Sequence, residues 1–327
     1  MKDKLTYVTP QDVGELPPPK TKITFADKKK VIFDSASHIK AVIEEQKLRG
    51  EADPSQNRCE VRIKTDLPFI LVVGSSDWHL GSEHCDYEMF WKHYNLIKDT
   101  DGVFVNIIGD ERDNFVMPKL RAGLFEEVLN PQQQADLFQG LLQGWDDKGK
   151  ILARCGGNHD NFSWMEVGVN IENYWYQDMK SPLMRVGGFE HLKLNKIEYV
   201  GWLHHGLSVY NSTFNPNHAS RRSFEMQGPF DFSMMGHTHQ EEVSMGWRWS
   251  EEYAKRVCMV RTGTYKTDDT YAKSRQFPRG QEPGACILFD TREKRMMGFD
   301  NINSGIEALV AMNTYQQLVA AGMLGIK

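Results

Sequence analysis

The chain has 327 residues, a formal net charge of −5 and 40% hydrophobic residues, so it can bury a sizeable core and is not disordered by composition. No apolar run reaches the roughly 18 residues that span a membrane, and the first residues lack the apolar segment of a signal peptide. The five cysteines are scattered without a C-x-x-C pair, which argues against a disulfide framework or a cysteine zinc site. We therefore expect a cytoplasmic protein with no membrane partner.

Residues 1–58 form a predicted N-terminal extension. A proline run at residues 17–19 favours an extended segment, and a short helix is expected to begin near residues 34–35. The apolar positions of this helix recur at intervals of three and four: Ile39, Val42 and Ile43. Such a face needs a partner, which could be the core of the protein, a second subunit or another protein. Homo-oligomerisation through this arm is one prediction.

Residues 59–300 are expected to form the main domain, and their first half alternates between strands and helices. Three strands are predicted at 69–73, 103–108 and 151–155, and the first of them is fully apolar, as expected for a strand covered on both faces. A helix is predicted from about Tyr87 to Ile97. A second helix begins at Asn130-Pro131, with asparagine as the cap and proline in the first turn. This alternation indicates a layered α/β core.

The second half of this domain contains four further predicted strands with less helix between them: 199–203, 232–235, 257–260 and 286–289. A second sheet packed on the first is therefore expected. Residues 301–327 are predicted as a C-terminal helical segment, because a helical pattern runs from Gly305 to Leu324.

Polar side chains follow five of these strands, most of them beside glycine. The segments are Gly74–His79, Gly109–Asp113, Gly156–Asp160, His204–Gly206 and Gly236–His239. Six of the eleven histidines lie in these five turns. In α/β sheets, ligands gather at the carboxyl ends of the strands. The sequence therefore predicts a functional site at this edge.

Each turn by itself also has a structural interpretation. Asp77-x-His79 could be a turn with a surface histidine, and Asn158 could merely tolerate a left-handed backbone. One of His204 and His205 is expected to be structural, because neighbouring strand residues point to opposite faces. The combination of five strand ends, each with ligand-type side chains, favours a shared metal site.

The donor types indicate which metals this site would take. Imidazole, carboxylate and amide oxygen suit transition ions such as Mn²⁺, Fe²⁺ or Zn²⁺, and the lack of thiolate argues against a structural zinc cluster. Two ions about 3.5–4 Å apart need a bridging ligand, which a carboxylate with two oxygens can supply. Asp110 is the candidate bridge, and such an ion pair would activate a hydroxide and neutralise charge on a phosphoryl group.

The ordered series Asp-x-His, Gly-Asp-x-x-Asp, Gly-Asn-His-Asp, His-Gly and Gly-His-x-His resembles the calcineurin-like metallophosphoesterase superfamily, over about residues 70–240. The resemblance implies a four-layer α/β/β/α sandwich of two mixed sheets flanked by helices. It also implies a centre with two divalent transition-metal ions. Mn²⁺ is the expected metal, with Fe²⁺, Zn²⁺ or Ni²⁺ as alternatives.

The resemblance implies a role for each matched residue. The first metal would be held by Asp77, His79, Asp110 and His239. The second metal would be held by Asp110, Asn158, His205 and His237. His159 would face the phosphate and stabilise or protonate the leaving oxygen. Asp113 would hydrogen-bond His159 and set its orientation.

The substrate is less constrained by the sequence. The residues after Asp113 are not the Arg-Gly pair of the Ser/Thr phosphatase branch. The segments Ser76–Gly81 and Gly236–His239 look more like DNA repair exonucleases and their phage relatives, and Arg261–Tyr265 is similar to phage- or prophage-encoded members. We therefore expect hydrolysis of phosphodiester bonds in nucleic acid or nucleotides, in the host cytoplasm if the protein is phage-encoded. A phosphomonoesterase and a non-catalytic scaffold are the alternatives.

A few other side chains near the motifs could contact a substrate. A guanidinium of Arg112, Arg221 or Arg222 could clamp a phosphate, although a structural role is favoured for each of them. Trp78 and Phe115 could stack on a base, although aromatic residues beside ligands more often serve packing.

Overall fold

The computed structural model describes residues 35–52, 57–116, 121–171, 178–206, 212, 215–249, 254–267, 270–274 and 279–324. The chain divides into two units, residues 1–52 and residues 53–327. Among the described residues, no helix combines the length and apolarity needed to cross a bilayer. The predicted extended segment at residues 17–19 lies outside the described residues.

The described part of the first unit is helix α1, Ser35–Ala52, which begins where the sequence predicted a helix start. The three apolar side chains of its predicted face are exposed: Ile39 by 59%, Val42 by 44% and Ile43 by 45%. Oligomerisation through this arm stays a prediction.

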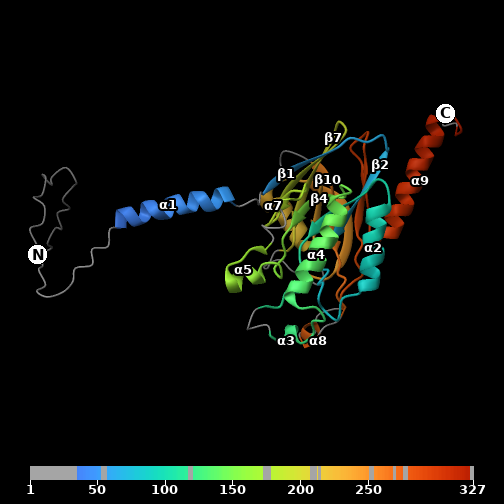
Figure 1. Ribbon diagram of the computed structural model, residues 1–327. Helices are drawn as coiled ribbons and strands as arrows, with labels where there is room; N and C mark the ends of the chain where they lie inside the picture. The colour runs from blue at the N-terminus through green and yellow to red at the C-terminus, as the bar shows by residue number, and fades with distance from the viewer. Residues whose placement is uncertain are drawn as a thin grey trace, which may run out of the picture. The chain divides into compact units, whose positions relative to one another are not determined.

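The second unit contains two six-stranded mixed sheets (Figure 1). The first sheet has the order β12-β11-β2-β3-β4-β5, in which β2, β3, β4 and β5 run parallel. Its strands are β2 Phe69–Ser75, β3 Val103–Ile108, β4 Ile151–Cys155, β5 Leu183–Met184, β11 Cys286–Asp290 and β12 Met296–Phe299. The second sheet has the order β1-β6-β7-β8-β10-β9. Its strands are β1 Arg58–Ile63, β6 Gly188–Leu194, β7 Ile197–His204, β8 Phe232–Met235, β9 Glu241–Trp249 and β10 Ala254–Thr262.

Three long helices cover one face of the first sheet: α2 Tyr87–Asp99, α4 Pro131–Asp146 and α9 Ile302–Ala320 (Figure 1). Helix α4 starts as predicted, because the Asn130 side chain accepts a hydrogen bond from the Gln133 N–H and Pro131 fills the first turn. Helix α9 begins earlier than the expected Gly305, because Asn301 caps the N–H groups of Asn303 and Ser304.

Helix α7, His218–Gln227, packs on the outer face of the second sheet, where Phe224 and Trp202 share a cluster of buried side chains. Shorter helices are α3 Arg121–Leu124, α5 Phe162–Val167 and α8 Thr270–Ser274. The order of layers is therefore helix, sheet, sheet, helix, and the predicted four-layer α/β sandwich is confirmed.

Strand β2 shows why its sequence is apolar throughout. Leu71 and Val73 contact the layer of long helices, whereas Ile70 and Val72 contact the second sheet. Both faces of the strand are therefore buried, as expected for a parallel strand between two layers. The parallel strands end at one edge, so the turns that follow them bring distant parts of the sequence together.

Candidate metal centre

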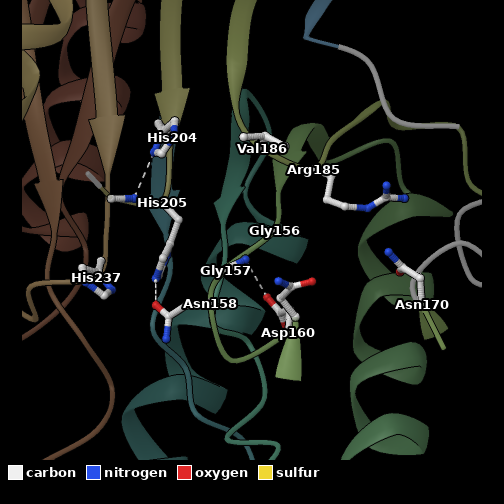
Figure 2. Close-up of a pocket in the computed structure, with 12 residues that line it drawn as sticks. Gly156, Gly157, Asn158, Asp160, Asn170, Arg185, Val186, His204, His205 and His237 are labelled. Carbon is white, nitrogen blue, oxygen red and sulfur yellow. Dashed lines mark hydrogen bonds between the residues drawn. The ribbon is translucent and has the colours of Figure 1, made fainter. Parts of the chain in front are cut away.

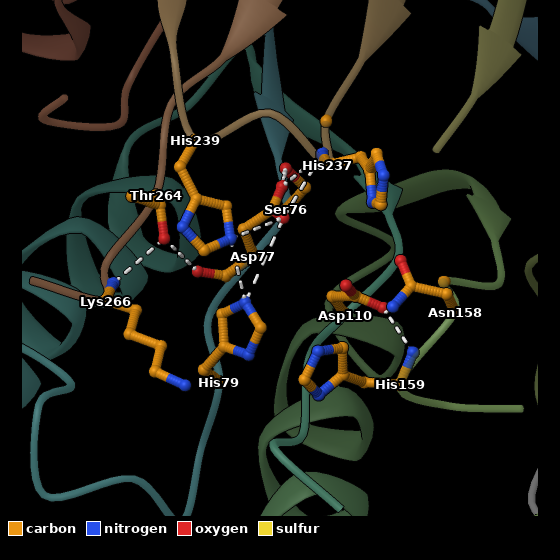
Figure 3. A network of polar contacts seen from close by, with 12 residues as sticks. Ser76, Asp77, His79, Asp110, Asn158, His159, His237, His239, Thr264 and Lys266 are labelled. Atoms are coloured by element: carbon orange, nitrogen blue, oxygen red, sulfur yellow. Dashed lines mark hydrogen bonds and ion pairs between the residues drawn. The ribbon is translucent and has the colours of Figure 1, made fainter. Parts of the chain in front are cut away.

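The seven side chains predicted as metal ligands lie together at the carboxyl ends of the strands. Figure 3 labels six of them, and Figure 2 labels the seventh, His205. One donor group contains Asp77, His79 and His239, and a second contains Asp110, His205 and His237. Within each group the donor atoms lie within 4.8 Å of one another. The resemblance assigns each of these groups to one metal and adds Asp110 to the first set and Asn158 to the second. A third donor group joins His79, Asp110 and His159.

In the first group, Nε2 of His79 lies 3.1 Å from Nε2 of His239. Nε2 of His239 lies 3.3 Å from Oδ1 of Asp77. Asp77 and His79 are buried, whereas His239 is partly exposed, so the group has an open side. Two imidazole nitrogens and a carboxylate oxygen at these separations form a donor set that suits a divalent transition ion.

The second group provides the test of whether a cation fits this site. The Asn158 side-chain oxygen faces three atoms that have lone pairs: Nδ1 of His237 at 2.8 Å, and Nε2 of His205 and Oδ2 of Asp110, both at 3.2 Å. Nδ1 of His205 lies 2.7 Å from the Ile108 carbonyl and donates to it, which leaves Nε2 as the nitrogen that faces the group. With the Asn158 oxygen on this side, four electron-pair donors converge as they would around a bound cation; with the amide turned over, its NH2 group donates to the other three atoms instead.

Glycines beside the ligands allow this close approach. A Cβ atom on Gly157 would lie 2.0 Å from Oδ1 of Asp110, and one on Gly236 would lie 2.5 Å from Oδ2 of Asp77. Neither position has room for a side chain. These two glycines therefore have a steric reason, since they let their turns pack against the carboxylates.

The backbone at the ligands adopts a rarely populated conformation. In the described part of the chain, seven non-glycine residues have positive φ, and five of them are predicted ligands: Asp77, His79, Asp110, His237 and His239. Asp, Asn and His tolerate this left-handed region better than other residues, but it still costs on the order of 1 kcal/mol or more each. Such strain concentrated in one site is typical of a functional centre.

Burial and charge give Asp110, His79 and His237 the protonation state that binds metal, whereas His205 keeps its proton until a metal displaces it. Burial opposes ionisation of Asp110, but the neighbouring imidazoles of His205 and His159 hold its pKa well below the usual range. Burial lowers the pKa of His79 and of His237 to about 4 each. Burial also acts to lower the pKa of His205, but the carboxylates of Asp110 and Asp77 outweigh it and raise this pKa to about 10.

Asp113 contacts a different imidazole from the one expected. Its carboxylate accepts a hydrogen bond from Nδ1 of His79 at 2.7 Å, whereas Nδ1 of His159 lies 3.9 Å from the same oxygen. His159 instead donates to the main-chain carbonyl of Asp113 at 2.6 Å. The expected bond between the Asp113 carboxylate and His159 is therefore corrected: the carboxylate orients the donor His79, and only the backbone of Asp113 orients His159.

His159 lies beside the donors without belonging to the two main groups. Its ring packs edge-on against His79 with 4.7 Å between ring centres, and its main-chain N–H donates to Oδ1 of Asp110 at 2.8 Å. Because Nδ1 is held by the Asp113 carbonyl, Nε2 is the nitrogen left for a substrate. Phe115 packs against the other side of this ring, 5.1 Å away.

The segment that follows β10 supports the centre in a way that sequence patterns did not reveal. Nζ of Lys266 lies 2.9 Å from Oδ1 of Asp113, and both side chains are buried. The hydroxyl of Thr264 donates to the Asp77 carbonyl at 2.9 Å, and Arg261, near the end of β10 itself, donates to the Gly236 carbonyl at 2.6 Å. Residues 263–267 also follow an apolar strand and contain glycine, which is the pattern of the other motifs. They contain no histidine or carboxylate, so they were not predicted as part of the site.

The other side chains considered from the sequence take structural positions. Trp78 is fully buried and packs against Phe90 and Trp145, so it cannot stack on a base. Arg112 is buried, with its guanidinium 5.9 Å from the Phe138 ring. The predicted clamp candidates Arg221 and Arg222 lie on α7 and do not line the cavity beside the centre.

His204 and His205 have the divided roles that their alternation predicts. The His205 ring faces the second donor group, with Nε2 3.0 Å from Oδ2 of Asp110. The His204 ring stacks on Trp202 and accepts a hydrogen bond from the Gly206 N–H at 3.1 Å. The geometry therefore brings His205, and not His204, into the centre.

The order of the five motifs and the convergence of their side chains together decide the kind of site. The chain resembles the calcineurin-like metallophosphoesterase superfamily. No protein-family model matches the sequence, and no curated protein matches it. The resemblance to metallophosphoesterases therefore rests on the motifs and on the geometry of the donors.

Several solved structures are similar in fold. Vacuolar protein sorting 29 from Cryptosporidium parvum is 13% identical, with 72% of this chain and 100% of that chain covered and a TM-score of 0.37. A predicted phosphoesterase from Streptococcus pneumoniae is 12% identical, with 71% and 98% covered and a TM-score of 0.33. Vps29 from Entamoeba histolytica, complexed with zinc, is 11% identical, with 71% and 99% covered and a TM-score of 0.36. Similarity at this level supports no inference about activity.

Proposed function

We propose that the protein is a hydrolase that cleaves phosphodiester bonds in nucleic acid or nucleotides with a centre of two divalent ions, Mn²⁺ in the first instance. The observation that carries this proposal is the convergence of two donor groups, with His159 beside both of them. When bound, the ions would supply an activated water and would neutralise charge on the phosphoryl group. Asp77, His79, Asp110 and His239 would hold one ion, and Asp110, Asn158, His205 and His237 would hold the other, so that only Asp110 is shared.

The protein's own side chains then act on the substrate oxygens. His159 is held through Nδ1 by the Asp113 carbonyl, so protonated Nε2 can donate to the oxygen that leaves. Asp113 and Lys266 form a buried ion pair that keeps a negative charge against Nδ1 of His79. This arrangement fixes the tautomer in which Nε2 of His79 is free to bind an ion.

The preference for a diester rests on sequence rather than on geometry. The forms Ser76–Gly81 and Gly236–His239 are similar to those of DNA repair exonucleases, and the Arg-Gly pair of the Ser/Thr phosphatases is missing after Asp113. A phosphomonoesterase with the same ions is the competing proposal. A non-catalytic scaffold would need none of the support that Lys266 and Asp113 give to His79.

The test is a comparison of substrates with Mn²⁺-loaded protein. Initial rates on bis-p-nitrophenyl phosphate and on p-nitrophenyl phosphate are measured side by side, followed by single-stranded and duplex DNA. We expect faster cleavage of the diester and degradation of DNA. The variant Asp110→Asn is the control, because loss of the shared carboxylate should abolish every rate that belongs to this centre. Faster cleavage of the monoester without DNA degradation would favour a phosphatase.

A further inference from the structure

A cavity of about 340 Å³ opens beside the second donor group (Figure 2). Asn158, His205 and His237 line one side of it. Asn161, Asn170 and Arg185 also line the cavity, and the sequence motifs assign no role to any of them. Its volume is at the lower end of the ~300–1,000 Å³ typical of small-molecule sites, so it suits a small group rather than a folded partner.

The fold places Arg185 at this cavity through its main chain. The Gly156 N–H donates to the Arg185 carbonyl at 3.1 Å, which ties the segment after β5 to the motif that carries Asn158. The Gly187 N–H donates to the Met184 carbonyl at 2.7 Å and closes a turn. Gly187 has φ of +91°, and a Cβ there would lie 2.5 Å from the Leu203 carbonyl. The turn therefore packs against the end of β7.

The chemistry of this side of the cavity suits an anion. Arg185 brings a guanidinium, and Asn161 and Asn170 bring amide groups that can donate hydrogen bonds. Asp160 also lines the cavity, but its Oδ2 accepts from the N–H groups of Asp110 and Gly157 at 3.0 and 2.9 Å. Asp160 is buried, and its Oδ1 lies 3.7 Å from a guanidinium nitrogen of Arg112, which offsets its charge.

We propose that this cavity binds a second phosphate of the substrate, adjacent to the phosphate that is cleaved, and that Arg185 determines this specificity. The inference rests on the proposed phosphodiester hydrolysis at the neighbouring donors. A group held between Arg185 and the second donor group would be bound at a fixed offset from the reacting phosphorus. The second phosphate belongs to a polynucleotide or to a nucleoside diphosphate, since both place two phosphates close together.

The experiment compares substrates that differ by one phosphate. The dinucleotide TpT contains only the phosphate that is cleaved, whereas pTpT and TpTp carry a second one. For the wild-type protein, we expect kcat/KM on either pTpT or TpTp to be roughly 10-fold higher than on TpT, mainly because KM is lower. A charged hydrogen bond to the second phosphate contributes on this scale. In Arg185→Gln this ratio should fall to about one, and Arg185→Lys should retain part of it.

The matched control is Arg222→Gln, which removes an arginine paired with Glu225 on the surface of α7 and should keep the wild-type ratio. A second comparison uses thymidine 5′-diphosphate and thymidine monophosphate. If the ratio of their kcat/KM values depends on Arg185, the second phosphate of the substrate belongs to a nucleoside diphosphate. An equal loss on TpT and on the phosphorylated forms in Arg185→Gln would overturn the proposal, as would a wild-type protein that does not distinguish them.

A binding measurement separates this inference from the proposed function. Calorimetry with Mn²⁺-loaded protein compares thymidine 3′,5′-bisphosphate with thymidine 5′-monophosphate, so it needs no turnover of a diester. Tighter binding of the bisphosphate that is lost in Arg185→Gln supports the cavity even if the protein cleaves no diester. Equal binding of both ligands to the wild-type protein overturns the proposal even if diesters are cleaved.

Discussion

Nδ1 of His79 lies 2.7 Å from Oδ1 of Asp113, and Nζ of Lys266 lies 2.9 Å from the same oxygen. Burial acts to raise the pKa of Asp113, but His79 and Lys266 hold it below the usual range. The carboxylate therefore stays ionised and keeps the proton of His79 on Nδ1, away from the donor group. Lys266, Asp113 and His79 form a buried series that ends at the first metal position.

The first prediction concerns this series. Asp113→Asn removes the negative charge behind His79, so we expect metal affinity at the first position to fall roughly 10–100-fold, as is usual for outer-shell partners of ligating histidines. Excess Mn²⁺ should restore most of the activity, because His159 is held by the main-chain carbonyl and not by the lost carboxylate. Activity is titrated against Mn²⁺ concentration.

Lys266→Met should shift the same titration in the same direction by a smaller factor, because Asp113 keeps its bond to His79. Lys273→Met, at an exposed lysine of α8, is the control and should leave the titration unchanged. A loss of activity in Asp113→Asn that no metal concentration restores would instead place the carboxylate in a role that acts through His159.

Much of this centre follows from the sequence, for a physical reason. Strands buried on both faces, such as β2 and β4, are mostly apolar and stand out from their neighbours. Their carboxyl ends must meet at one edge, so the ligands that follow them could be predicted as one site. The strands that were not predicted are the four edge strands β1, β5, β9 and β12, of which β5 has only two residues, and the inner strand β6. In β6, buried residues alternate with partly exposed ones.

The partner of Asp113 could not be predicted in the same way. Both His79 and His159 lie close to it, and the choice depends on positions that the turn at residues 109–113 fixes only in three dimensions. Lys266 was missed because a lysine after a strand has no ligand signature. Arg185 was missed because its place depends on the turn closed by Gly187, which packs against β7.

The second prediction separates His159 from the ligands. Its main-chain N–H already binds Oδ1 of Asp110, so replacement of the ring leaves that anchor in place. We expect His159→Gln to retain about two ions per chain and to lose roughly 10²–10⁴-fold in rate, as for the loss of a general acid. Metal content is measured by elemental analysis beside the rate on bis-p-nitrophenyl phosphate. His159 also forms a donor group with His79 and Asp110, so loss of metal in this variant would identify it as a ligand.

The third prediction is a release of protons when metal binds. The metal-free pKa of His205 is about 10, above its ordinary 6.5, so near pH 7 its imidazole carries a proton that a metal must displace. Metal affinity at the second position should therefore rise with pH, by about tenfold per unit between pH 7 and this pKa. Calorimetry of Mn²⁺ binding in buffers with different ionisation enthalpies gives the number of protons.

His204, next to His205 in the chain, offers a matched control for the number of protons released. His205→Asn should reduce the released protons by about one, because asparagine supplies an oxygen donor that has no proton to lose. His204→Asn should leave the number unchanged, since its ring stacks on Trp202 outside the donor group. If the wild-type protein releases no proton at neutral pH, the imidazole is not the protonated donor that the two carboxylates favour.

The fourth prediction concerns Glu190, a fully buried acid on β6 that joins the two sheets. Its Oε2 accepts a hydrogen bond from the Asn106 amide on β3 at 2.7 Å, and its Oε1 has no hydrogen-bond partner among the described residues. Burial raises the pKa of Glu190 from 4.5 to about 7, although the Asn106 bond opposes this. The folded protein therefore prefers the protonated carboxyl group.

The sign of the stability change follows from this shift. Below pH 4.5 the carboxyl is protonated in both the folded and unfolded states, and its contribution to stability is fully present. As the pH rises through about 7, the folded protein must ionise a buried group, and that contribution is lost. Glu190→Gln keeps the shape of the protonated group without the ionisation. Urea unfolding should therefore give similar free energies for both proteins at pH 5, and a variant more stable by on the order of 2 kcal/mol at pH 8. A difference between the two proteins that does not change from pH 5 to pH 8 would show that Glu190 is not forced to ionise inside the core.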